Sequence, residues 1–195
     1  GVEGLKHIEN WNTYKLKYLD LTYNNFESKG LKYIEKWNTC KLKYLHLYWN
    51  YLELESLKHI ENWKCIKLSG LDLRSNYFGS EGLYSLEKWE CPRIEYLDIS
   101  SNILGSEGLR PIEKWNCSNL KYLYLSLNNL GSQGLRFIEK WNCSNLLRLR
   151  LNLNNLSIEG LQYLEKWDCP LIKHLNSSSN NLLNDQVKAF RKNLN

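Results

Sequence analysis

Apolar residues recur in a block of 26 residues, which is clearest between Gly134 and Asn154. In the first half of the block, apolar positions stand three residues apart in the pattern G-L-x-x-[IL]-E-x-W. This spacing predicts one face of a short helix. In the second half, leucines alternate with other residues in L-x-x-L-x-L-x-x-N-x-[LF], which predicts a short strand.

The block returns at a fixed register along the whole chain. The tryptophan recurs at Trp11, Trp37, Trp63, Trp89, Trp115, Trp141 and Trp167, and the asparagine at Asn24, Asn50, Asn76, Asn102, Asn128, Asn154 and Asn180. Seven repeats therefore fill the 195 residues, which is typical of a solenoid. We expect one domain over 1–195, with repeats that start near 4, 30, 56, 82, 108, 134 and 160.

One strand and one helix in each repeat predict parallel strands on one side and helices on the other. We expect the tryptophan rings to fill the gap between successive helices. The asparagine amide is expected to bond backbone groups where the strand turns away, and to reach the neighbouring repeat. Ser80, Ser106 and Ser132 precede the helical segments and are predicted N-caps.

The two ends differ from the repeats between them. The chain opens inside a repeat, at GVEGLKHI, and contains no methionine, so we expect further sequence before it. At the other end, about 183–195, the pattern predicts a polar helix with Val187, Phe190 and Leu194 on one face. We interpret this tail as a C-terminal cap.

The pattern LxxLxLxxNxL resembles the leucine-rich repeats of the ribonuclease-inhibitor-like class. That class includes NLR receptors, Ran GTPase-activating protein and F-box substrate receptors. The resemblance covers all seven repeats, although 26 residues is slightly short for the class. It implies an α/β solenoid: a right-handed arc with a parallel concave β-sheet and short helices on the convex side.

Composition narrows the possible partners. The net charge is +5, with 26 basic and 21 acidic side chains, which is not the concentrated charge of a nucleic-acid binder. No apolar run approaches the ~20 residues that span a membrane.

Six cysteines raise the question of disulfides. Five of them, Cys65, Cys91, Cys117, Cys143 and Cys169, follow the tryptophan by two residues, and Cys40 follows it by three. A slot repeated in this way indicates a small buried apolar position. We therefore expect free thiols and a reducing, cytoplasmic location. A secreted protein with bridges between repeats is the alternative.

Catalytic and metal-binding patterns are missing from the sequence. His7 and His59 share a helix slot two repeats apart, roughly 10 Å in a stack, which is too far to share a metal. The GSEG and GSQG stretches lack the Lys-Ser/Thr of a phosphate loop. A glutamate recurs on every helix, which favours a structural role. We therefore predict no catalytic residue, no metal, no cofactor and no enzyme activity.

Residues that flank the strand leucines are expected to lie on the concave face with their side chains towards solvent. These positions vary between repeats, which makes them candidates for recognition. Tyrosine, tryptophan and arginine are enriched at binding hot spots. The predicted partner-binding residues are Tyr18, Asp20, Tyr44, His46, Tyr48, Trp49, Asp72, Arg74, Tyr96, Asp98, Tyr122, Tyr124, Arg148 and Arg150. They give an acidic and aromatic first half and a basic second half. Tyrosine also simply suits an exposed strand, and that reading stays open.

These features predict non-catalytic protein recognition or scaffolding through the concave face. One alternative is a regulator of another enzyme, either of the GTPase-activating type or as a ubiquitin-ligase substrate receptor. Another is a subunit of an RNA-protein assembly, because Lys15, Lys17, Lys41, Lys43 and Lys67 edge the first repeats.

Overall fold

Seven short strands form one parallel sheet in the order of the sequence. The computed structural model describes residues 1–8, 13–35, 41–63 and 66–182. Each strand pairs with the next in a register of 26 residues, so Tyr18 lies beside Tyr44 and Leu19 beside Leu45. The strands are β1 (Tyr18–Asp20), β2 (Tyr44–His46), β3 (Gly70–Asp72), β4 (Tyr96–Asp98), β5 (Tyr122–Tyr124), β6 (Arg148–Arg150) and β7 (His174–Asn176).

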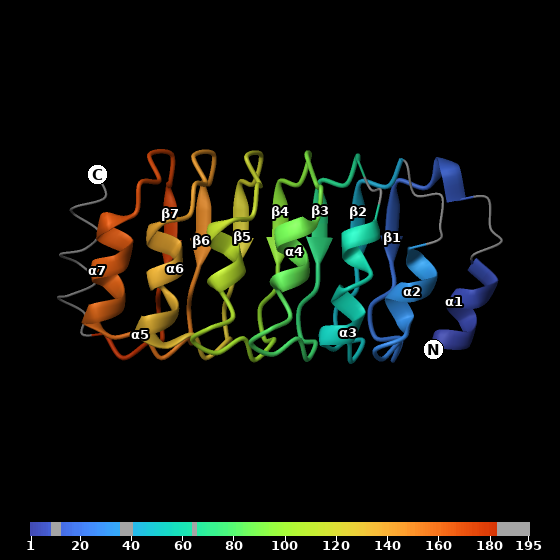
Figure 1. Cartoon of the computed structure of the whole chain (residues 1–195), viewed down its shortest axis with the longest axis horizontal. Coiled ribbons are helices and arrows are strands. Elements are labelled where there is room, and N and C mark those ends of the chain that lie inside the picture. Colours follow the sequence, from blue (N-terminus) through green and yellow to red (C-terminus); the bar gives the residue numbers. More distant parts are fainter. Residues whose placement is uncertain (9–12, 36–40, 64–65, 183–195) are drawn as a thin grey trace.

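The helices lie in a single layer over one face of the sheet (Figure 1). All are short, and several are single turns of 3-10 helix. The α-helices are α1 (Val2–Ile8), α2 (Gly30–Ile34), α3 (Leu54–Leu57), α4 (Tyr84–Lys88), α5 (Gly131–Gly134), α6 (Arg136–Glu139) and α7 (Ile158–Lys166), and the 3-10 helices are η1 (Thr13–Lys15), η2 (Ile60–Asn62) and η3 (Arg110–Glu113). The α/β solenoid expected from the 26-residue period is confirmed.

The serine N-caps were predicted wrongly. Ser80 and Ser106 lie in turns, and α4 begins only at Tyr84, without a side-chain cap. Ser132 lies inside α5, whose N-cap is Leu130. The reason is backbone geometry, because Gly79 and Gly105 precede the serines with φ of +62° and +60°. These left-handed residues redirect the chain into a turn where a cap would need extended backbone.

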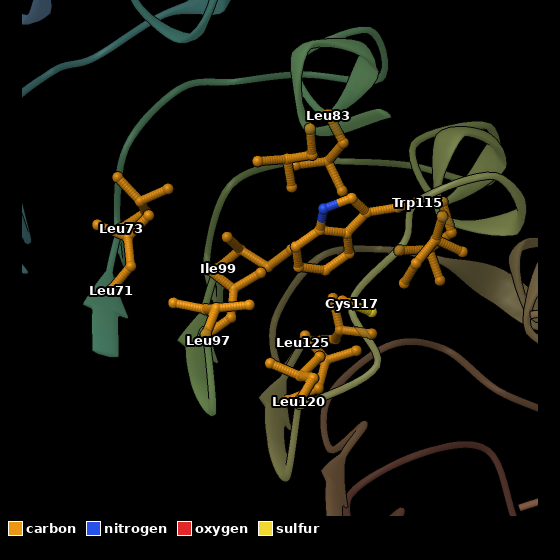
Figure 2. Packing of buried hydrophobic residues seen from close by; sticks show 14 of the residues in the cluster. Leu71, Leu73, Leu83, Leu97, Ile99, Trp115, Cys117, Leu120 and Leu125 are labelled. Atoms are coloured by element: carbon orange, nitrogen blue, oxygen red, sulfur yellow. The ribbon is translucent and has the colours of Figure 1, made fainter. Parts of the chain in front are cut away.

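Between the two layers lies a continuous apolar core. Leucines from the strands face the helices, and Leu45, Leu71, Leu97 and Leu123 are fully buried. Figure 2 shows the Trp115 indole between Leu83 on the helix side and Ile99 on the strand side. The ring was expected between successive helices, but it lies between the helix layer and the strand layer, as part of the core.

Successive tryptophans stack in parallel along the core. The ring centroids of Trp115 and Trp141 are 6.5 Å apart with an interplanar angle of 6°. Trp141 and Trp167 are 6.0 Å apart at 8°. Trp11 and Trp37 lie outside the described residues, as do Cys40, Cys65 and the predicted C-terminal cap.

The asparagines form a second ladder, where each strand ends. Asn76, Asn102, Asn128 and Asn154 are buried, and each backbone N–H donates to the side-chain oxygen of the next asparagine, at 2.7–3.2 Å. The side-chain nitrogens donate to carbonyl oxygens of their own repeat and of the preceding repeat. Buried backbone groups need such partners, so this slot tolerates few other residues.

Candidate functional site: the face of the sheet away from the helices

The face of the sheet turned away from the helices, here called the concave face, carries most of the residues predicted to bind a partner. Parallel register places equivalent side chains of adjacent repeats next to one another, roughly 4.8 Å apart. Tyr18 and Tyr44 are exposed there, with 55% and 45% of their surface accessible. They pair directly across β1 and β2.

Gly70 is the gap in this column of tyrosines. A Cβ atom at Gly70 would lie 2.6 Å from Cδ1 of Tyr44, so the ring of Tyr44 covers this glycine. A larger residue at position 70 would force the ring of Tyr44 to move from this position.

A cluster of aromatic rings occupies the first two repeats. The ring centroids of Tyr18 and His46 are 5.2 Å apart. Tyr23 stacks on Trp49 at 5.2 Å and meets the edge of Tyr48 at 5.1 Å. The hydroxyls of Tyr23 and Tyr48 lie at hydrogen-bond distance, 3.2 Å. The columns chosen from the sequence missed Tyr23, which the period would have found because it occupies the slot of Trp49.

Arg74 joins this cluster to the middle of the sheet. Its Nη2 lies 2.6 Å from Oδ2 of Asp72, and its Nε lies 3.4 Å from Oδ2 of Asp98. The guanidinium also covers the ring of Tyr48, 4.9 Å from the centroid. The hydrogen bond with Asp72 raises the pKa of Arg74 still further, so the guanidinium is permanently charged.

Asp72 and Asp98 are buried, and each bonds to the backbone at the end of its own strand. They are only 1% and 4% exposed. Each accepts a hydrogen bond from the backbone N–H two residues later, at Arg74 (3.1 Å) and Ser100 (3.0 Å). Asn176 makes the same bond to Ser178, so the slot works without a charge. Of the three predicted aspartates, only Asp20 is exposed.

The stability of this part of the face depends on pH through the buried carboxyl of Asp98. Burial raises the pKa of Asp98, and the nearby charge of Asp72 adds to the effect. A raised folded-state pKa means that this group stabilises the fold below the ordinary pKa of aspartate. That contribution is lost as the pH rises through the raised value, where the carboxyl must ionise in a dry site.

A second patch occupies the later repeats. Tyr96 meets the edge of Tyr124 with centroids 5.4 Å apart. The guanidinium of Arg150 covers the ring of Tyr124, 4.3 Å from the centroid. Tyr122 and Arg148 are half-buried beside this pair. The predicted residues therefore form two patches, one aromatic with Arg74 and one of Tyr96, Tyr124 and Arg150.

The helix side carries ion pairs between neighbouring repeats. His59 Nδ1 lies 2.8 Å from Oε2 of Glu35, and Lys114 Nζ lies 3.4 Å from Oε1 of Glu87. These pairs give the recurring glutamate a structural role at these two positions. Among the described residues, no group of three histidine, cysteine, aspartate or glutamate side chains is arranged to hold a metal ion.

None of the helices in the described part of the chain has the length and hydropathy to cross a bilayer. The thiols of Cys91, Cys117, Cys143 and Cys169 are free and buried in the core, as predicted for this slot. Burial raises the pKa of Cys91 and of Cys169 to about 12. The thiols of Cys91 and Cys169 therefore stay protonated and unreactive at neutral pH.

The chain is similar to a known protein family and to solved structures. A family profile described as "Leucine Rich repeat" matches residues 15–34, 90–112, 116–138 and 142–164. A search of curated protein sequences found no match. Among solved structures, Listeria monocytogenes InlP is similar with a TM-score of 0.64 and 16% sequence identity. The similarity covers 93% of this chain but only 46% of the InlP chain.

At that identity the likeness to InlP concerns the fold. The matched segments and the InlP likeness agree with the strand register and the asparagine ladder described above. The chain is a leucine-rich repeat protein.

Proposed function

We propose that the chain is a non-catalytic module for protein recognition or scaffolding, which binds a protein partner through the concave face. The observation that carries the proposal is the exposed aromatic cluster of Tyr18, Tyr44 and Trp49, extended by Tyr48 and Arg74. Large aromatic and arginine side chains dominate the binding energy of protein interfaces. Leucine-rich repeat proteins commonly bind other proteins, which supports the proposal at a coarser level.

Alanine at Tyr44, Tyr48, Trp49, Tyr96 and Arg150 together is expected to weaken partner binding at least about tenfold, since each truncation at a hot spot costs more than ~1 kcal/mol. The measurement is quantitative pull-down from extracts of the source cells, followed by mass spectrometry. A matched control carries alanine at Tyr84, Lys58 and Lys166, which are exposed on the helix side. Both variants should keep the unfolding midpoint within a few degrees of the parent.

Equal recovery of partners by the parent and the concave-face variant would contradict the proposal. The same pull-down includes a ribonuclease arm, because Lys15 and Lys41 lie over the ring of Tyr14 at 5.4 and 5.8 Å. Partner loss on ribonuclease treatment would favour the RNA-protein alternative. Enrichment of a GTPase or of ubiquitin-ligase subunits would favour a regulator of another enzyme.

We also propose a reducing, intracellular location, supported by the buried thiols at four successive repeats. Titration with a thiol reagent under denaturing, non-reducing conditions should find all six cysteines free in protein isolated from its source. A lower count would favour the secreted alternative, because disulfides persist in oxidising compartments.

A further inference from the structure

The loops that follow the strands carry a row of exposed apolar side chains, here called the apolar rim. These loops line the edge of the sheet towards which the strand arrows point in Figure 1. Every one of the first six repeats contributes at least one such residue, and all are 41–62% exposed. The apolar rim consists of Tyr23, Trp49, Tyr51, Tyr77, Ile103, Leu127 and Leu153.

The backbone at these positions is unfavourable for the residues that occupy it. Tyr23, Trp49, Tyr51, Ile103, Leu127 and Leu153 have φ between +53° and +60°. In this left-handed region the Cβ atom approaches the following carbonyl oxygen, and a β-branched residue such as Ile103 is a pronounced outlier. Because the side chains remain exposed, their burial does not offset this strain.

The chain itself shows that the fold does not require apolar residues here. Equivalent loop positions in other repeats hold Asn25, Ser75, Ser101, Asn129 and Asn155, at φ between +50° and +59°. Asparagine tolerates the left-handed region well. The same loop therefore forms with small polar residues. Tyr23 stacks on Trp49 and Tyr51 stacks on Tyr77, whereas Ile103, Leu127 and Leu153 are about half exposed, which favours a contact outside the chain for these three. Strained residues of this kind concentrate at functional sites.

The charged residues near the apolar rim indicate the charge of a suitable partner. Glu27, Glu53 and Glu81 are exposed in the same loops and make no ion pair with any residue that the structure describes. The backbone of Glu53 pairs with that of Tyr77, a rim residue, in an isolated parallel β-bridge. Glu55 is paired with Lys58, and Glu107 with Arg110 and Arg136, so they add little to this acidic flank. Lys29 is exposed nearby, and the acidic character rests on Glu27, Glu53 and Glu81.

The opposite edge of the sheet has the reverse charge. Lys15, Lys17, Lys41, Lys43 and Lys67 are exposed at the loops that precede the strands. Within the described ranges none of them lies within ion-pair distance of a carboxylate. The two edges are therefore polarised, and a basic partner would favour the rim side. An anionic lipid surface would be repelled there.

Spacing favours a helix as the occupant. Neighbouring repeats are ~4.8 Å apart, and six of them span ~24 Å. An α-helix advances ~5.4 Å per turn, so it offers one apolar residue per turn at nearly the same spacing and covers the rim with ~16 residues. We propose that the apolar rim and its acidic flank bind a basic amphipathic helix of a protein partner. The rim shares Trp49 with the aromatic cluster of the concave face, and Tyr23 stacks on that residue. The proposal does not rest on the function proposed for the concave face, because Ile103, Leu127 and Leu153, which test it, lie outside that cluster.

The test uses a synthetic peptide of about 18 residues, with leucine on one helical face and lysine elsewhere. Saturable binding to the whole chain is measured by fluorescence anisotropy of the labelled peptide. A peptide of the same composition with the stripe scrambled, and one with lysine replaced by glutamate, should bind at least about tenfold more weakly, since both lose the complementary pattern.

Ile103→Asn, Leu127→Ser and Leu153→Ser are combined in a variant that copies residues found elsewhere in these slots. It should lose at least about tenfold in peptide affinity, as expected when hot-spot side chains are removed. Its melting temperature should stay within a few degrees of that of the parent, because asparagine suits the left-handed backbone and serine already occupies the slot of Leu127 and Leu153 in other repeats. Glu27→Lys with Glu81→Lys should also weaken binding. Tyr44→Ala with Arg150→Ala, on the concave face, should leave peptide affinity unchanged.

The proposal is overturned if no saturable binding of the striped peptide occurs, or if the rim variant binds it as well as the parent. Vesicles of phosphatidylcholine, with and without phosphatidylserine, form a separate arm. Binding to vesicles but not to peptide, lost in the rim variant, would instead make the rim a membrane contact. Failure of the concave-face pull-down would leave these outcomes unaffected.

Discussion

Replacing Asn102 with leucine is expected to lower the free energy of unfolding by about 4–6 kcal/mol, because several buried backbone groups lose their partners at once. The Asn102 Nδ2 donates to the carbonyl oxygens of Leu73, Ile99 and Ser100, each at 3.0 Å. Its Oδ1 accepts from the backbone N–H of Asn76 at 3.2 Å. Leucine provides none of these bonds, and its bulk keeps water out.

The matched control is Asn180→Leu at the last repeat. Asn180 makes equivalent bonds to the carbonyls of Leu151, Ser177 and Ser178, but it is only partly buried. Asn180 is partly exposed, so water can replace part of its hydrogen bonds, and we expect a smaller loss than at Asn102. Equal losses in urea-induced unfolding would show that burial of the ladder does not set its strength.

The position of Asn102 adds a second readout. In a solenoid each repeat contacts only its neighbours, so damage in the middle separates two stacks of repeats. Amide exchange should accelerate in the strands on both sides of Asn102, with the smallest change in β7. Uniform acceleration along the chain would instead indicate that all the repeats unfold as one unit.

The period of the sequence was sufficient to predict the architecture. The leucines of the strands, the tryptophans of the core and the asparagines of the turns each follow a requirement that every repeat shares. Such requirements appear as constant slots, and Leu45, Trp141 and Asn102 occupy the environments predicted for them. The order and direction of the strands follow from stacking identical units.

What the sequence did not predict depends on the backbone within single loops. Ser80 and Ser106 were predicted to cap helices, whereas the left-handed conformation of Gly79 and Gly105 before them places turns there. The strain at Ile103 and Leu127 was equally hidden, since periodicity says nothing about the sign of φ. These positions look like ordinary variable slots until the φ values are known.

The details of the concave face also depend on side-chain choices. The sequence placed Asp72 and Asp98 on the surface, where the structure buries both against Arg74 and the backbone. Alternation in a strand gives the face to which a residue belongs, but not whether a long neighbour covers it. Tyr44 and Trp49, by contrast, are 45% and 42% exposed, as the sequence predicted for binding residues.

Trp141→Ala is expected to destabilise the protein by about 3–5 kcal/mol, the range for removing a buried tryptophan from a packed core. Trp141 is 2% exposed and stacks on a second indole on each side, Trp115 and Trp167. Alanine would therefore remove contacts from three repeats. Urea-induced unfolding should show the loss, and amide exchange should locate it in β5, β6 and β7.

Trp141→Phe separates the stacking of the ring from its polar atom. The buried indole nitrogen of Trp141 has no hydrogen-bond partner among the described residues. Phenylalanine keeps an aromatic ring in the stack and removes that poorly satisfied N–H, so we expect a loss of less than about 2 kcal/mol. If phenylalanine proves as harmful as alanine, the full size of the indole and its N–H, and not simply an aromatic ring in the stack, would hold these repeats together.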